Sequence, residues 1–266
     1  MKKWSAAALI ILIIIFALPI LVMVLSSFAD EDLIDALKNG SVEGIQFGTE
    51  QYRKMFTEGD LIQKMGNSAV IALGALAVQI PVGLAGGLFL ARSEWKAKKV
   101  LTGMLMIALL LPFQSMMVPM FRMSKWSGLY DTHAALILLC GFSPLAFLFM
   151  MVLIGMIPNE QWEAASLDTK SLGRIVFAVV LPQILPGMAV LVLLIFSEAW
   201  NMVEQPLILL QDDVLRPAAL VLNDIKKDHS GYEYAGSVLY SLPVVVLYAA
   251  ALAAMRKQSG IRPRIR

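Results

Sequence analysis

Six apolar stretches dominate this 266-residue sequence, and each is long enough to cross a lipid bilayer. A membrane-spanning helix needs about 20 predominantly apolar residues. Charged residues make up 16% of the chain, against about 25% in soluble domains. We therefore expect an all-α polytopic membrane protein with six transmembrane helices. These are expected at about residues 4–28, 65–91, 101–123, 132–157, 180–203 and 234–255.

The N-terminus has the charge pattern of a signal peptide, because Lys2 and Lys3 precede a long apolar run. That run continues to about Phe28, which is too long for a signal sequence, and no small-residue cleavage site follows it. We interpret residues 1–28 as an uncleaved N-terminal transmembrane helix. The rest of the chain is predicted to form three segments. These are an outer loop (29–64) with helical patches at 30–38 and 49–57, a membrane core (65–255) and a basic tail (256–266).

Positive charges near the helix ends predict the orientation, since short cytoplasmic loops are enriched in Lys and Arg. The short segment Arg92–Lys99 and the tail 256–266 are both dense in positive charge. Both termini are therefore expected in the cytoplasm. This places the two sizeable loops, about 29–64 and 204–232, on the outer face.

Few side chains have the spacing of a catalytic or metal site. The single cysteine, Cys140, excludes an internal disulfide and a cysteine-rich metal centre. His133 and His229 lie far apart without matching carboxylates, so no catalytic residue, no metal ligand and no enzyme activity is predicted. No basic run is interleaved with aromatics, which excludes a nucleic-acid surface. Gly83, Gly86 and Gly87 lie mid-membrane, where small residues let helices approach closely.

The segment between the fourth and fifth stretches, residues 158–182, is the most informative loop. Pro158 suits a first helical turn, and acids such as Glu163 favour a helix N-terminus. The segment is too polar to span a membrane, yet it has apolar side chains to bury. A short amphipathic helix of this kind lies on a membrane surface or docks into a groove of another protein. The pattern alone does not separate the two.

The same loop resembles the EAA loop of ABC-importer permeases. It contains Glu163-Ala164-Ala165, then Asp168, then Leu181-Pro182. Further matches follow in order over residues 65–255, and the chain is most similar to the smaller permease of maltose-type carbohydrate importers. These matches are Leu111-Pro112, Gly128–Thr132, Trp200-Asn201 with Pro206-Leu207, and Tyr234–Ser237 with Leu242-Pro243. The tail 256–266 departs from the family pattern.

The resemblance implies a cytoplasmic coupling helix between the fourth and fifth transmembrane helices. It assigns ATPase coupling to Glu163, Ala164, Ala165, Leu167, Asp168 and Thr169. Thr169 stands where the family has glycine, so we expect a gentler bend there or a bend moved to Gly173. Asp168 either contacts the ATPase or caps a second short helix that begins near Thr169.

The resemblance also implies the partners. These are a second permease subunit, two copies of a cytoplasmic ABC ATPase, an external solute-binding protein and membrane lipid. ATP and Mg would be bound by the ATPase, so no cofactor is expected on this chain. The implied location is the bacterial inner membrane, with a multi-pass chain that forms half of a sugar or oligosaccharide pathway.

Three neighbouring residues are candidates for the substrate pathway. Glu198 is the one acid well inside an apolar stretch, and an intramembrane acid points to a functional site. Trp200 and Asn201 offer an aromatic plane and an amide, which suit sugar binding, although Trp also anchors at membrane interfaces. Two alternatives remain open: an ion-coupled secondary transporter, and an importer of a glycerol-phosphate-type solute.

Overall fold

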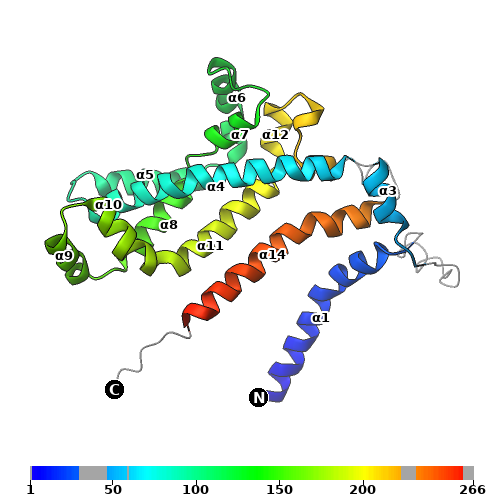
Figure 1. The fold of residues 1–266 in the computed structure, drawn as a ribbon, viewed down its shortest axis with the longest axis horizontal. Helices are drawn as coiled ribbons and strands as arrows, with labels where there is room; N and C mark the ends of the chain where they lie inside the picture. Colours follow the sequence, from blue (N-terminus) through cyan, green and yellow to red (C-terminus); the bar gives the residue numbers. More distant parts are fainter. Residues whose placement is uncertain (1, 30–46, 59, 223–231, 260–266) are drawn as a thin grey trace. The chain divides into compact units, whose positions relative to one another are not determined.

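The computed structural model describes residues 2–29, 47–58, 60–222 and 232–259. Every named element in these ranges is a helix, and a single bridge between Ala29 and Phe47 is the only strand-like pairing described there. The chain divides into two compact units, one formed by residues 1–66 with 217–243 and the other by 67–216 with 244–266. The expected all-α class is thus confirmed for the described residues (Figure 1).

Within the described residues, three continuous helical segments are long and apolar enough to cross a membrane. They match the predicted second, fifth and sixth spans. The segments are α4 (Leu61–Arg92), the run of α10 (Leu172–Ile175), the π-helical η3 (Val176–Val180) and α11 (Leu181–Trp200), and α14 (Glu233–Ser259). Each contains a proline, which is tolerated because neighbouring groups in a membrane protein satisfy the freed carbonyl.

The predicted third span is broken into α5 (Lys98–Leu110) and a second arm of η2 (Phe113–Met116) and α6 (Met117–Trp126). The two arms meet at 104°. Leu111 precedes a proline, which disfavours helical geometry, and its ψ is 128°. Pro112 then lacks the N–H that would continue the helix. A proline inside an apolar stretch predicts a kink, and here the helix is fully broken instead.

The predicted fourth span is also a bent pair, formed by α7 (His133–Leu139) and α8 (Pro144–Gly155), with 46° between them. Pro144 begins α8, and the Ser143 hydroxyl caps it by accepting from the Ala146 N–H. Counting each bent pair as one span gives up to five spans in the described chain. The first predicted span coincides with the apolar helix α1 (Lys2–Ser26), which is not among these five. The total of six stays a prediction.

The first unit is centred on the buried side chains of Met55, Leu61 and Ala218. Gln51 connects separate segments of this unit by hydrogen bonds. The side-chain amide of Gln51 donates to the carbonyls of Ser26 (2.7 Å) and Ala29 (2.8 Å), and its Oε1 accepts from the Ala235 N–H. Gln51 belongs to α3 (Glu50–Glu58), which occupies the helical patch predicted at 49–57. The patch predicted at 30–38 lies outside the described residues.

The second unit is built on the close contact of α4 with α8. A Cβ added at Gly83 would lie 2.9 Å from the Cβ of Ala146, and one at Gly87 would lie 2.8 Å from the backbone nitrogen of Met151. The expected close approach of helices at these glycines is therefore confirmed. Elsewhere in this unit, α12 (Glu204–Leu209) packs with α6 and α7. Figure 1 shows α12 and α9 (Asn159–Asp168) at opposite ends of the unit.

Candidate functional site

A short helix, α9, lies where the sequence predicts an amphipathic element. It follows the extended Pro158 and begins at Asn159, with Glu160 in its first turn. Within the helix the Ser166 hydroxyl donates to the Trp162 carbonyl at 2.8 Å. The helix ends at Asp168. Its ten residues carry three acids and no base, namely Glu160, Glu163 and Asp168.

The turn after α9 explains how threonine replaces the glycine of the family pattern. Thr169 has φ −152° and ψ 140°, an extended conformation that any residue adopts without strain. Its hydroxyl accepts from the Ser171 N–H at 3.2 Å. Ser171 in turn caps α10 by accepting from the Arg174 N–H at 3.4 Å. Of the two roles considered for Asp168, the cap of the second helix is therefore wrong, because Ser171 is the cap. Of the two positions considered for the bend, Gly173 is wrong as well, because it lies inside α10.

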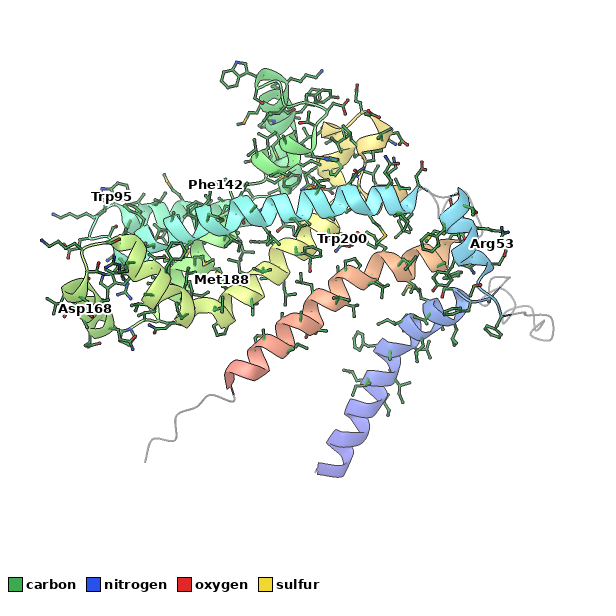
Figure 2. The ribbon with its side chains drawn as sticks, in the orientation of Figure 1. Arg53, Trp95, Phe142, Asp168, Met188 and Trp200 are labelled. Carbon is green, nitrogen blue, oxygen red and sulfur yellow. The ribbon has the colours of Figure 1, made fainter. Side chains whose placement is uncertain are left out.

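Most of the predicted coupling residues share the exposed surface of α9. Leu167 is 89% exposed, and Glu163, Ala164 and Asp168 are exposed as well. Glu163 and Leu167 are four residues apart and so lie on one face of the helix. Ala165 is the exception, since it is buried on the inner side. Figure 2 shows Asp168 at the outer edge of this helix.

Arg92, the last residue of α4, binds both α9 and the end of α8. Its Nη2 donates to the carbonyls of Ile154 (3.0 Å) and Ile157 (2.7 Å), and its Nη1 donates to the Asn159 side-chain oxygen at 2.7 Å. The guanidinium also lies over the Trp162 ring, 4.9 Å from its centroid. In the sequence Arg92 stands out only as part of the basic loop, and this role was not predicted.

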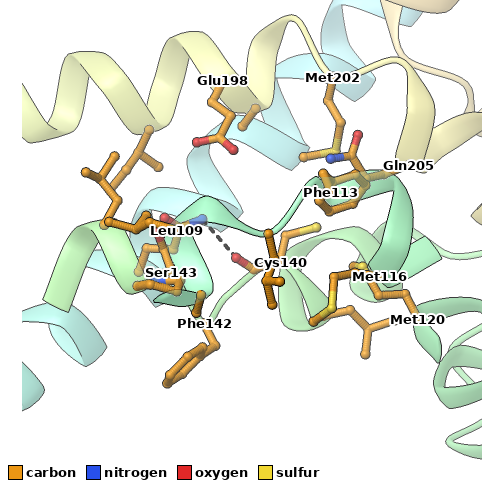
Figure 3. A pocket seen from close by; sticks show the side chains of 18 residues that line it. Leu109, Phe113, Met116, Met120, Cys140, Phe142, Ser143, Glu198, Met202 and Gln205 are labelled. Carbon is orange, nitrogen blue, oxygen red and sulfur yellow. Dashed lines mark hydrogen bonds between the residues drawn. The ribbon is translucent and has the colours of Figure 1, made fainter. Parts of the chain in front are cut away.

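A cavity of about 360 Å³ lies inside the second unit, at the break between α5 and η2 (Figure 3). Its wall is mainly apolar and aromatic, with polar side chains set into it. The polar lining residues are Gln79, Cys140, Ser143, Glu198 and Gln205. Figure 3 shows the carboxylate of Glu198 directed into the space between the labelled residues. None of the described lining residues is basic.

Gln79 is the polar residue that the structure adds most clearly to the candidate site. It is 7% exposed, and its Nε2 donates to the Cys140 carbonyl at 3.0 Å. Its Oε1 is buried with no hydrogen-bond partner among the described residues. A buried acceptor without a donor is costly, so the wall retains a capacity for one more hydrogen bond. Gln79 was not predicted, and the signal that could have indicated it is an amide inside the apolar stretch 65–91.

Only one of the three predicted pathway residues lines this cavity. Glu198 does so, whereas Trp200 is 2% exposed and stacks on the Phe196 ring at 5.5 Å. Asn201 is exposed and its side-chain amide donates to the Ser197 carbonyl at 2.8 Å. Trp200 and Asn201 therefore do not line the cavity together with Glu198.

Comparison with protein families gives a match over more than half of the chain. Residues 83–259 match the family described as binding-protein-dependent transport system inner membrane component. The matched range contains both α9 and most of the residues that line the cavity.

Several characterised proteins are similar along most of their length. The arabinooligosaccharides transport system permease protein AraQ of Halalkalibacterium halodurans is 27% identical, with 86% of this chain and 84% of that protein covered. The diacetylchitobiose uptake system permease protein NgcG of Streptomyces coelicolor is 27% identical, with 92% and 82% covered. The trehalose transport system permease protein SugB of Mycobacterium tuberculosis is 26% identical, with 79% of each covered.

Solved structures share the fold. A chain of a bacterial ABC transporter involved in the import of the acidic polysaccharide alginate superposes with a TM-score of 0.82 at 17% identity, covering 95% of both chains. A chain of a bacterial alginate ABC transporter in complex with alginate pentasaccharide-bound periplasmic protein gives 0.69 at 15% identity, covering 96% of this chain and 95% of that one. At these identities the likeness concerns the fold.

Proposed function

Because the chain belongs to the family of binding-protein-dependent transport system inner membrane components, we propose that it forms half of the pathway of an ATP-driven sugar importer. The other half is a second permease subunit. Two copies of a cytoplasmic ATPase bind ATP and Mg and drive the cycle, and an external binding protein delivers the sugar. The proposed division of labour along this chain is an N-terminal anchor at 1–28, an outer loop at 29–64, the permease core at 65–255 and a basic tail at 256–266.

The exposed face of α9 is the observation that carries the proposed ATPase docking. The side chain of Leu167 is 89% exposed on a helix with three acids and no base. Helices that lie on membranes usually carry Lys and Arg on the polar face, because lipid headgroups are often anionic. The charge of α9 therefore favours a protein groove over the membrane surface. In this proposal Glu163, Ala164, Leu167 and Asp168 meet the groove directly, while Ala165 and Thr169 hold the helix and its turn.

The proposed orientation rests on the contact between the basic loop and α9. Arg92 begins the segment that is dense in positive charge, and it binds Asn159 of α9. The positive-inside rule therefore assigns α9 to the cytoplasmic side together with that loop. Both termini are proposed to lie on the same side.

A sugar or oligosaccharide is the proposed substrate. The similar proteins are transport permeases for arabinooligosaccharides, diacetylchitobiose and trehalose. The cavity combines the carboxylate of Glu198 with amides and aromatic rings, and such groups hydrogen-bond and stack on neutral sugars. A phosphate would lack a cationic partner among the described lining residues, which disfavours a glycerol-phosphate-type solute. Membership of this family leaves no support for an ion-coupled secondary transporter.

Affinity purification of the intact complex tests the docking step. The tagged chain, extracted in mild detergent, is expected to retain an ABC ATPase and a second permease. Leu167→Asp is expected to release the ATPase, because a carboxylate replaces the apolar contact in the groove. Reconstituted wild-type complex is expected to hydrolyse ATP faster when loaded binding protein is added.

Leu207→Asp is the matched control. Leu207 is also exposed, at 64%, and lies on α12 at the other end of the second unit. The control variant should keep the ATPase. Equal retention of the ATPase by wild type and L167D would refute docking through α9, and a wild-type chain that never retains an ATPase would refute the proposed function itself.

A further inference from the structure

Arg92 is the one charged side chain described that ties α4 to α9 by direct hydrogen bonds. We infer that Arg92 is a positioning residue that sets the angle of α9 and transmits its movement to the cavity through α4. The inference rests on the proposed function, because it assumes that α9 docks on the ATPase. It concerns how docking is converted into movement, which the docking face itself does not explain.

The joint that Arg92 closes is short. α8 ends at Gly155 and α9 begins at Asn159, so three residues separate the two helices. Helix ends leave carbonyls without an intrahelical donor. Arg92 donates to the Ile154 carbonyl in α8, to the Ile157 carbonyl within the joint and to the Asn159 side chain in α9. Rotation of α9 about the joint therefore breaks hydrogen bonds to a charged group.

The chemistry of the guanidinium suits this task. Its planar fork donates in several directions at once, and its face lies over the ring of Trp162, the fourth residue of α9. A lysine ammonium is a compact point charge that cannot reproduce both the fork and the stacking. Nearby lysines do not share the role: Lys98 donates to the Ser93 carbonyl instead, and Lys96 is exposed.

A single continuous helix, which includes Pro81, connects this contact to the cavity. Arg92 and Gln79 lie on the same continuous helix, α4, thirteen residues apart. At a rise of 1.5 Å per residue, they are roughly 20 Å apart along the axis. Gln79 is fastened to the Cys140 carbonyl at the cavity wall. A displacement of α9 that is passed to the end of α4 therefore reaches the wall without crossing a flexible segment.

The test measures sugar imported per ATP hydrolysed by the reconstituted complex. Arg92→Gln is expected to leave ATP hydrolysis active and to lower the import ratio roughly fivefold, within the range reported for residues of coupling networks. Lys96→Gln removes a neighbouring charge without touching α9 and should not change the ratio. A purely structural role would lower the yield or melting temperature of the complex and leave the ratio of the surviving complexes unchanged.

A double substitution separates the contact from general damage. Arg92→Lys should lower the ratio as well, and combining it with Asn159→Asp should restore part of it, because the new carboxylate lies within reach of the ammonium. If R92Q retains the wild-type ratio, or if N159D gives no recovery in the R92K background, the inference is wrong. A wild-type complex without ATPase stimulation would instead refute the proposed function, before any Arg92 variant is compared.

Discussion

The carboxylate of Asp131 accepts a hydrogen bond from the backbone N–H of Gln211 at 2.7 Å, although the two residues are 80 positions apart. A second bond comes from the Asp212 N–H at 3.0 Å, and the N–H of Asp131 donates to the Leu209 carbonyl at 3.0 Å. Asp131 has φ 61°, a left-handed conformation that Asp and Asn tolerate better than most residues. This one residue ties the turn after α6 to the segment after α12.

Asp131→Asn should preserve this connection and Asp131→Ala should lose it. Asparagine keeps a side-chain oxygen that accepts from backbone N–H groups and keeps the tolerance for positive φ. Alanine has neither property. Hydrogen exchange of the Gln211 and Asp212 amides is the direct measurement. Faster exchange is expected in D131A, and wild-type exchange in both variants would show that Asp131 does not hold the segment.

The same contact predicts a pH dependence. The backbone N–H groups of Asp212 and Gln211 stabilise the carboxylate and hold the pKa of Asp131 below its usual value. A carboxyl whose pKa is lower in the folded state stabilises the fold fully above its ordinary pKa and loses that effect as the pH falls through the lowered value. Protection of the Gln211 amide, corrected for intrinsic exchange, should therefore persist through mildly acidic pH and fall only in strong acid. D131N has no ionisable group there and should show no such step.

The contact of α4 with α8 should be sensitive to one added methyl group. A Cβ at Gly87 would meet Met150 and the backbone of Met151, so Gly87→Ala should lower stability by about 1–3 kcal/mol, as overpacking usually does. Gly103→Ala is the control, because no heavy atom lies within 4 Å of the added Cβ. The melting temperature of the purified complex measures both. A G103A variant as destabilised as G87A would contradict the packing argument.

Removal of the cavity carboxylate should weaken the affinity for sugar. Hydrogen bonds to charged groups contribute about 1.5–3 kcal/mol, so Glu198→Ala should raise the half-saturating sugar concentration roughly tenfold or more. Glu204→Ala serves as the control: Glu204 is an exposed acid of α12 that accepts from the Gln114 amide and does not line the cavity. Initial import rates at graded sugar concentrations distinguish the two. Identical affinity in E198A and wild type would remove Glu198 from the pathway.

Local patterns were sufficient to predict much of the helical architecture. Apolar runs located α4, α11 and α14, and Pro158 with its following acids located α9, because these signals act within one or two helical turns. The 104° break at Leu111-Pro112 was expected only as a kink. A proline weakens one helical hydrogen bond, but the angle that results depends on what packs on either side, which local sequence does not record.

The candidate site was harder to predict, because its residues meet only after folding. Glu198 stood out as an acid in an apolar run, yet Gln79 and Gln205 line the same cavity from helices far apart in the chain. Trp200 showed the opposite outcome. Its chemistry suits a sugar, but its ring packs on Phe196 of the same helix, one turn away. Residue type indicates what a side chain is able to bind, and tertiary packing determines whether it is free to bind it.

The thiol of Cys140 can serve as a probe of the transport cycle. It is the single cysteine of the chain, and it lies on the wall of the cavity beside the break between α7 and α8. A fluorescent or alkylating thiol reagent would therefore label this subunit at one place, without prior mutagenesis. The rate of labelling with the ATPase at rest, and again with its nucleotide bound, would follow the opening and closing of the cavity in real time.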